Sequence, residues 1–462
     1  MIRCNDTSAT DIFADTPFVD EKYHPHARLA VSHEDSQSTY CIHACVFRHV
    51  TGRRGNQTKA AQLAYLLYQK DQNPILQLCT AVLEYFSYAC CMTYESIDQI
   101  QKALAASVFS DRDSKKKAAG RALGTVLEII TFYLIRDYGL ENNTAIEQSL
   151  TEYANEEIGH NVEFTLHGSK KLGKVYEEDG VLSSKNISDS LNLDYDDLFL
   201  KKSEFAVKKD IVRNASIVFD APKAPHMVVA YPNSEDNSAD VYELKTSPFA
   251  MFECKRVGVE EGMKKGPQSI EKAKQGAYVA LAASKLQKIR RSDGTQLGVW
   301  EKPDGSFEIK EYDSLLEQII MQSQLDGLVV TVGVISDHGN WFSALVQNKE
   351  TKVLASAYDW LLFLTDKGLS EFIEDALLGK DPSMSETRQA FIASTNKDKK
   401  SGQSVTFTKK KLLKAADAEL TRYFRDNRDR IASWFNVITP QGGTIGQMFE
   451  QLKLISAKEQ IV

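Results

Sequence analysis

The first regular pattern of apolar and polar residues begins about forty residues into the chain. Residues 1–40 are polar and weakly patterned, so we interpret them as an N-terminal arm. From residue 41 to about 110, apolar residues recur at intervals of three and four, most clearly over 60–68 and 75–86. This period is that of an amphipathic helix, and the pattern therefore predicts a helical N-terminal region over 41–115.

A longer amphipathic segment follows a charged break at 111–117. Between Gly120 and Gly139, one face of the predicted helix carries Leu123, Leu127, Ile130 and Leu134. Glycine favours the left-handed conformation that ends helices, so Gly139 is a natural stop. One acidic residue, Glu128, lies among the apolar neighbours of this helix.

The pattern then changes to short runs typical of strands. These runs, rich in β-branched and aromatic residues, are 162–166, 215–219, 226–231, 240–246 and 249–257. A polar, acidic insertion lies near 175–210, and a strong helix is predicted over 270–290. The uncharged run 328–335 predicts a buried strand. Helix, strands, helix and strand in this order predict an α/β unit with a mixed sheet flanked by helices.

The expected organisation is a 1–40 arm, a 41–115 helical region, a 116–345 core and a mostly helical 346–462 region. With 462 residues the chain is long enough for two or three domains, and 42% apolar residues are ordinary for a folded protein. The net charge of −7 gives no overall attraction for nucleic acid. Basic groups concentrated in one cleft would still bind phosphates.

Cysteine usage and the N-terminus indicate a cytoplasmic protein. The seven cysteines are odd in number and lack a disulfide framework, which favours a reducing compartment and buried thiols. The N-terminus has no apolar signal segment, and no window is long and apolar enough for a membrane span. We therefore expect no membrane association.

Two charged residues in the strand 249–257 are the main candidates for chemistry. Successive strand residues face opposite sides, so Glu253 and Lys255 share one face. Burying such a pair is unfavourable unless it is paired or used. Ser247-Pro248 predicts a tight turn, and a hairpin folded there would set Asp240 opposite residues 253–255.

A second carboxylate would complete a site for a hard cation, and two residues compete for that place. Asp240 is one, and Asp220, at the end of the strand 215–219, is the other. Either acid with Glu253 would supply oxygen ligands for Mg²⁺, while Lys255 would orient a water molecule or stabilise charge on a phosphate. The residues alone do not decide between the two.

Residues 118–335 resemble the PD-(D/E)xK nuclease superfamily, and most closely its type II restriction endonucleases. The Glu253-Cys254-Lys255 strand matches the E-x-K element, although Glu243-Leu244-Lys245 is a second one. The resemblance implies that Glu128 helps to bind metal and that Gln275 and Tyr278 support the site. The sequence departs from the family in having His226 where an aspartate is expected.

This resemblance implies a nuclease core with helical additions. It implies that the protein cuts double-stranded DNA at specific sites with Mg²⁺. It also implies a homodimer, whose two-fold symmetry would match a palindromic site. Alternatives are another nuclease of the superfamily, such as a recombination exonuclease or a junction resolvase, or a DNA-binding protein without catalysis. No phosphate-binding loop, nucleophile elbow or zinc-protease motif is present, so we expect no nucleotide cofactor.

Several basic residues are candidates for contacts with DNA. Lys223, Lys264, Lys265, Lys272 and Lys274 lie close in sequence to the proposed site, and Lys285, Lys288, Arg290 and Arg291 lie at the end of the predicted helix. Candidates for base recognition are Arg53 and Arg54 in the N-terminal region and the lysine-rich segment 397–414.

Overall fold

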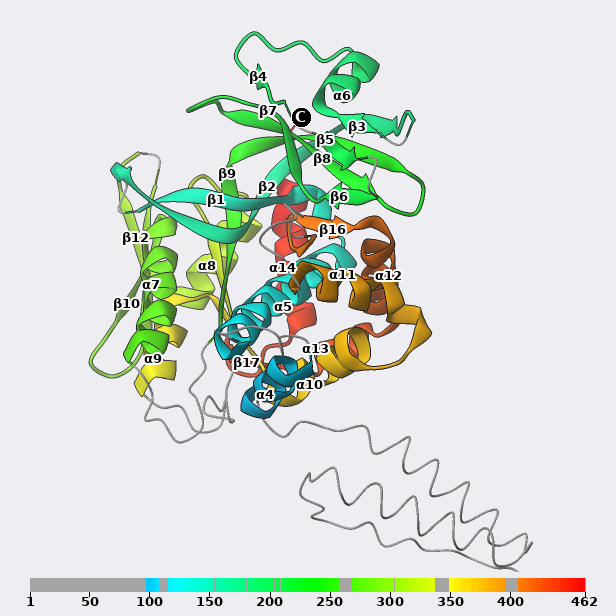
Figure 1. Ribbon diagram of the computed structural model, residues 1–462. Coiled ribbons are helices and arrows are strands. Elements are labelled where there is room, and N and C mark those ends of the chain that lie inside the picture. Colours follow the sequence, from blue (N-terminus) through cyan, green and yellow to red (C-terminus); the bar gives the residue numbers. More distant parts are fainter. Residues whose placement is uncertain are drawn as a thin grey trace, which may run out of the picture. The chain divides into compact units, whose positions relative to one another are not determined.

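In the computed structural model, the unit Met92–Val462 is built around a mixed sheet (Figure 1). The described residues are 97–107, 115–152, 155–179, 181–202, 204–207, 210–256, 267–302, 304–336, 349–395 and 406–461. The helices expected before residue 97, with Arg53 and Arg54, lie outside the described residues.

A mixed sheet of nine strands forms the centre of this unit. Its main path runs β17-β14-β13-β9-β8-β7-β4, and β2 pairs with β9 and with β1. The strands of this sheet are β1 Thr144–Glu152, β2 Asn155–Tyr176, β4 Phe199–Leu200, β7 Ser216–Asp220, β8 His226–Asn233, β9 Ser238–Arg256, β13 Val330–Ser336, β14 Trp360–Leu364 and β17 Phe435–Thr439.

The long strand β9 organises the sheet because it changes neighbours along its length. On one side it pairs with β2 from Ser238 to Phe252. On the other side its first half pairs antiparallel with β8, and its second half pairs parallel with β13. The parallel part therefore carries the C-terminal end of β9 into the middle of the sheet.

Strand β9 corrects the expectation of a turn at Ser247-Pro248. The strand continues through both residues, so the segments 240–246 and 249–257 form one element. Opposite Pro248, the register with β2 is irregular around His167. Proline lacks a backbone N–H, and an irregularity of this kind accommodates it without breaking the strand.

Helices cover both faces of the sheet, and Figure 1 shows α7 and α9 on one side and α5 on the other. The α-helices are α4 Ile97–Ser107, α5 Lys115–Asp137, α6 Ser184–Leu191, α7 Pro267–Ala283, α8 Tyr312–Met321, α9 Lys349–Ala357, α10 Asp366–Phe372, α11 Ser385–Thr395, α12 Lys414–Asp426, α13 Arg428–Ala432 and α14 Ile445–Lys458. Short helical segments are η2 Glu141–Asn143, η3 Ile373–Leu378 and η4 Pro382–Met384.

The two predictions based on the clearest patterns are confirmed. In α5 all four expected apolar residues are buried, and Gly139 follows the helix with a φ of +80°. Every residue of β13 is buried, as its uncharged sequence predicts. These elements form the two layers on which the candidate site is built.

Two smaller sheets lie beside the main one. The first, in the order β10-β11-β12, consists of β10 Leu286–Arg290, β11 Gln296–Glu301 and β12 Phe307–Glu311. The second, in the order β15-β16-β6-β5-β3, consists of β3 Leu182–Ser183, β5 Glu204–Val207, β6 Ile211–Arg213, β15 Phe407–Thr408 and β16 Lys411–Leu413.

The helix expected over 270–290 is shorter than predicted. Helix α7 ends at Ala283, and residues 286–290 form β10, which pairs with β11. Pairing with a neighbouring strand overrides the helical tendency of this short, mixed segment.

The sheet also extends past residue 345, where the core was expected to end, because β14 and β17 pair within it. Among the described residues, no helix is long and apolar enough to cross a membrane.

Candidate active site

Glu253 and Lys255 lie on the parallel part of β9, where their neighbours on β13 are Gly333 and Ile335. The Glu253 side chain is completely buried, and Lys255 is 25% exposed. The Lys255 Nζ lies 2.5 Å from Oε1 of Glu253. The shared face expected from strand alternation is therefore formed, with the two side chains in contact.

A further carboxylate joins this pair from β2. The pairing of β2 with β9 ends at Phe164 and Phe252, and Glu163 is the next residue of β2 beyond that pair. Its Oε2 accepts a hydrogen bond from the N–H of Cys254 (3.0 Å), and its Oε1 lies 3.3 Å from the Lys255 Nζ. The point where the two strands separate thus brings two carboxylates and one ammonium together.

The pKa values of these three groups are shifted from their ordinary values. Burial, together with the neighbouring Glu163 carboxylate, raises the pKa of Glu253 to about 8. Burial opposes ionisation of Glu163 as well, but interactions with Glu253, Lys255 and the Cys254 N–H outweigh it and lower the pKa of Glu163. Burial disfavours the charged Lys255, yet the two carboxylates raise its pKa above its usual range.

Glu253 carries an unusual set of contacts for a buried acid. Its Oε1 lies 2.5 Å from the Lys255 ammonium, and its other close polar neighbour is a second acid, Glu163. When protonated, the carboxyl can donate a hydrogen bond to Glu163, which accounts for the opposite pKa shifts of the two acids. A buried carboxylate with so few donors keeps lone pairs that a divalent cation can use.

Helix α7 and Tyr358 cover Glu253 on the other side. A Cβ atom placed on Gly276 would lie 2.7 Å from Cγ of Glu253 and 2.7 Å from the Tyr358 hydroxyl, so only glycine fits between them. His160 of β2 is 32% exposed, and its Nε2 lies 4.0 Å from Oε1 of Glu253. Solvent therefore reaches the cluster through the partly exposed His160 and Lys255.

Glu128 approaches the cluster from the opposite layer. Cys254 points toward α5, where its Sγ lies 3.4 Å from Oγ1 of Thr131, one helical turn from Glu128. Glu128 forms an ion pair with the buried Lys409 (2.9 Å). Its pKa is raised by burial and, to a smaller extent, by the charges of Glu163 and Glu147, while Lys409 opposes the shift.

Neither Asp220 nor Asp240 lies with Glu253, which corrects the expectation for the second carboxylate. Asp220 ends β7 and forms an ion pair with Lys201. Asp240 lies thirteen residues before Glu253 on the same strand, roughly 40 Å away at about 3.3 Å per residue. Its Oδ1 lies 2.7 Å from Lys171. The predicted turn that would have folded Asp240 back does not form.

Gln275 and Tyr278 also differ from expectation. Both are exposed, Tyr278 to 54%, and the face of α7 that packs on the sheet is formed by Ala273, Gly276, Ala277 and Ala280. The side chain that packs next to Glu253 is instead Tyr358, whose ring lies against Gly333.

The expected DNA-contacting residues lie in different places. Lys264 and Lys265 lie outside the described residues, as does the side chain of Lys272. Lys274 is half-buried on α7, and Lys223 is exposed in the turn between β7 and β8. In the lysine-rich segment, residues 396–405 lie outside the described residues, and Lys409, Lys410 and Lys414 are engaged in ion pairs.

Glu163 is the member of the cluster that sequence reasoning missed. A signal for it exists, because Glu163 interrupts the apolar run Val162-Glu163-Phe164-Thr165-Leu166 in the same way that Glu253 interrupts its own strand. Among the described residues, no group of three or more His, Cys, Asp or Glu side chains is arranged to hold a metal ion. Glu163 and Glu253 together form a pair of oxygen donors.

Comparison with known proteins gave no counterpart for this chain: no family model matches it, and no characterised protein or solved structure matches it significantly.

Proposed function

We propose that this protein is a Mg²⁺-dependent endonuclease of the PD-(D/E)xK type, similar to type II restriction enzymes, that hydrolyses phosphodiester bonds in double-stranded DNA. The proposal is carried by one observation: Glu163, Glu253 and Lys255 meet where β2 separates from β9. Two acids and one cation at the end of a strand, with solvent access on one side, suit hydrolysis of a phosphodiester.

The pair of acids fits a hard divalent cation. Mg²⁺ commonly takes one or two protein carboxylates and fills its remaining positions with water and substrate phosphate. Glu163 and Glu253 would hold it, and their contacts with the Lys255 ammonium leave further lone pairs on both carboxylates. When bound, the ion would supply Lewis acidity and lower the pKa of a coordinated water.

Lys255 has a separate role in the proposal. Its raised pKa keeps it protonated over the whole physiological range. The ammonium is fixed between the two carboxylates and remains partly exposed. It can therefore donate a hydrogen bond to a non-bridging phosphate oxygen and stabilise the negative charge that develops during attack by water.

The test is digestion of plasmid and of long unmethylated linear DNA with Mg²⁺. We expect cleavage by the wild type and losses of at least about 100-fold in Glu163→Gln, Glu253→Gln and Lys255→Ala. Asp220→Asn and Asp240→Asn are matched controls that should retain activity, because those acids lie elsewhere. Melting curves verify that every variant is folded.

The outcomes of this test separate the enzymatic proposal, the site and the mode of cutting. A folded wild type that cleaves no DNA with Mg²⁺ or Mn²⁺ overturns the enzymatic proposal. Loss of activity in Asp220→Asn or Asp240→Asn, with Glu163→Gln still active, overturns the site. Discrete fragments support site-specific cutting within a restriction–modification system, whereas progressive loss from the ends indicates an exonuclease. Chromatography of the active species shows whether it is a homodimer.

A further inference from the structure

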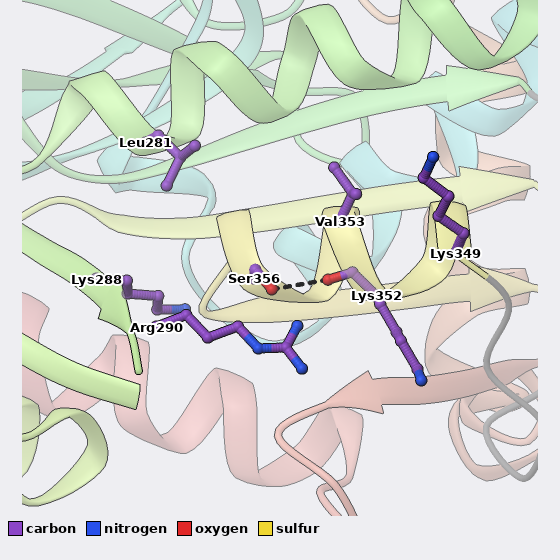
Figure 2. Close-up of a pocket in the computed structure, with 7 residues that line it drawn as sticks. All are labelled: Leu281, Lys288, Arg290, Lys349, Lys352, Val353 and Ser356. Atoms are coloured by element: carbon purple, nitrogen blue, oxygen red, sulfur yellow. Dashed lines mark hydrogen bonds between the residues drawn. The ribbon is translucent and has the colours of Figure 1, made fainter. Parts of the chain in front are cut away.

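A cavity of about 660 Å³ lies beside the candidate active site, between α7, β10 and α9 (Figure 2). Four basic side chains line it, together with one hydroxyl and two apolar residues: Lys288, Arg290, Lys349, Lys352, Ser356, Leu281 and Val353. No acidic side chain is among the lining residues. We call this cavity the basic groove.

Three of the four cations are free to bind a ligand. Arg290, Lys349 and Lys352 are exposed, and none has a side-chain hydrogen bond or ion pair within the described part of the chain. Lys288 differs because its Nζ donates to the carbonyl oxygen of Tyr358 (2.8 Å) and lies 3.3 Å from Asp359. Lys288 therefore anchors β10 beneath the groove.

The groove continues into a second cavity of about 360 Å³, which shares Lys288, Arg290, Lys352 and Ser356 and reaches the end of β17. Figure 2 shows Arg290 and Lys352 extending to the same side of α9, with Lys349 at the start of that helix. Asp313 and Asp359 line the second cavity. Asp359 accepts hydrogen bonds from Thr331 and Tyr312, and the Lys288 ammonium 3.3 Å away compensates its charge.

The basic groove adjoins the catalytic cluster through two shared elements. Helices α7 and α9 pack in one apolar cluster on the face of the sheet that carries Glu253. Leu281 follows Gly276, which touches Glu253, by five residues, or about 7.5 Å along α7. A polyanion bound at the cluster is thus within reach of the groove.

We propose that the basic groove binds the sugar-phosphate backbone of the DNA that is cut at Glu253, with Arg290, Lys349 and Lys352 contacting successive phosphates. This inference rests on the proposed function. Exposed cations on flexible side chains bind charge without reading sequence. Lys349 and Lys352 are about 4.5 Å apart along α9, and the basic residues extend from there to Arg290 over two connected cavities, which is a longer track than a single small anion occupies.

The test is the salt dependence of binding, measured by fluorescence anisotropy with a labelled duplex of about 30 base pairs in EDTA, between about 50 and 200 mM potassium chloride. For the triple variant Arg290→Ala/Lys349→Ala/Lys352→Ala, we expect the slope of log affinity against log salt to fall in magnitude by about 2 to 3. The control Lys185→Ala/Lys202→Ala/Lys380→Ala removes three exposed lysines elsewhere and should keep the wild-type slope.

An unchanged slope and affinity in the groove variant would overturn the inference, as would a wild type that binds no duplex. Competition with tripolyphosphate gives a second readout. If tripolyphosphate binds the wild type through the groove and the duplex does not, the groove is a small-anion site and the inference fails. If the groove governs duplex binding but the protein never cuts DNA, the DNA contact stands and only the nuclease proposal is lost.

Discussion

A carboxyl group buried between a strand and a helix keeps its proton unless a cation compensates for the loss of water. Glu253 is in this situation, because burial and the Glu163 carboxylate oppose its ionisation and outweigh the contact with the Lys255 ammonium. The Glu253 carboxyl, with a pKa of about 8, therefore loses its proton just above neutral pH. Perturbed acids of this kind concentrate at functional sites, since few structural roles require them.

The first prediction concerns how stability depends on pH. The pKa of Glu253 is raised from 4.5 to about 8 on folding, so the folded state binds the extra proton between these values. The stabilisation from this proton is complete below about pH 4.5 and is lost as the pH rises through about 8. Glu163, whose pKa is lowered, contributes in the opposite direction and at lower pH.

Unfolding by urea in EDTA, measured from about pH 6 to about pH 9, tests this prediction. The wild type should lose stability relative to Glu253→Gln as the pH rises, because glutamine carries no titrating proton. If the difference between the two proteins stays constant over this range, Glu253 is not the buried titrating acid described above.

At the scale of elements, the contact between helix α7 and strand β9 covers one side of Glu253. Gly276 of α7 lies against both Glu253 and Tyr358, and a methyl group there has no space. Gly124 of α5 is a matched case without neighbours, since a Cβ atom added there meets nothing within 4 Å. The two glycines thus differ only in what surrounds them.

We predict opposite effects for alanine at these two positions. Gly276→Ala should destabilise the protein by about 1–2 kcal/mol, because overpacking exceeds the gain in helix propensity. Gly124→Ala should stabilise it by about 0.5–1 kcal/mol, since only the propensity changes. Gly276→Ala should also reduce cleavage by displacing the Glu253 carboxylate. Stabilisation by both variants in urea melts would contradict the packing of α7 on Glu253.

The same scale shows what could be predicted from the sequence. Helix α5, strand β13 and the shared face of Glu253 and Lys255 follow from periodicity and alternation, which are local properties. The pairing of β2 with β9 is not local. It brings together Glu163 and Glu253, which are ninety residues apart in the sequence. The turn expected at Ser247-Pro248 failed because a register irregularity on β2 accommodates the proline.

At the scale of the molecule, the C-terminal region belongs to the same folded unit as the candidate site. Strands β14 and β17 continue the sheet beyond β13, and Lys409 contacts Glu128 on α5. Residues after 345 therefore complete the layers that hold the site. We do not expect the segment 116–345 to fold alone, because its last strand, β13, would lose the neighbour that covers its edge.

A buried ion pair provides the strongest test of this integration. Arg136 of α5 lies 2.7 Å from Asp417 of α12 and 2.5 Å from Glu141, and its side chain is only 9% exposed. Tyr133 donates a second hydrogen bond to Asp417. Removal of the cation leaves the buried Asp417 carboxylate and the partly buried Glu141 carboxylate without a counter-charge, which is far more costly than the loss of a surface pair.

We therefore predict that Arg136→Met lowers the free energy of unfolding by about 3–5 kcal/mol. Arg425→Met, on the same helix as Asp417, is the control, because Arg425 is 54% exposed in its pairs with Glu235 and Asp426. It should change stability by about 0–1 kcal/mol. Urea denaturation monitored by circular dichroism and by tryptophan fluorescence gives both values. If α5 and the C-terminal region form one cooperative unit, the two probes shift together in Arg136→Met; separate transitions would show that the C-terminal region unfolds independently.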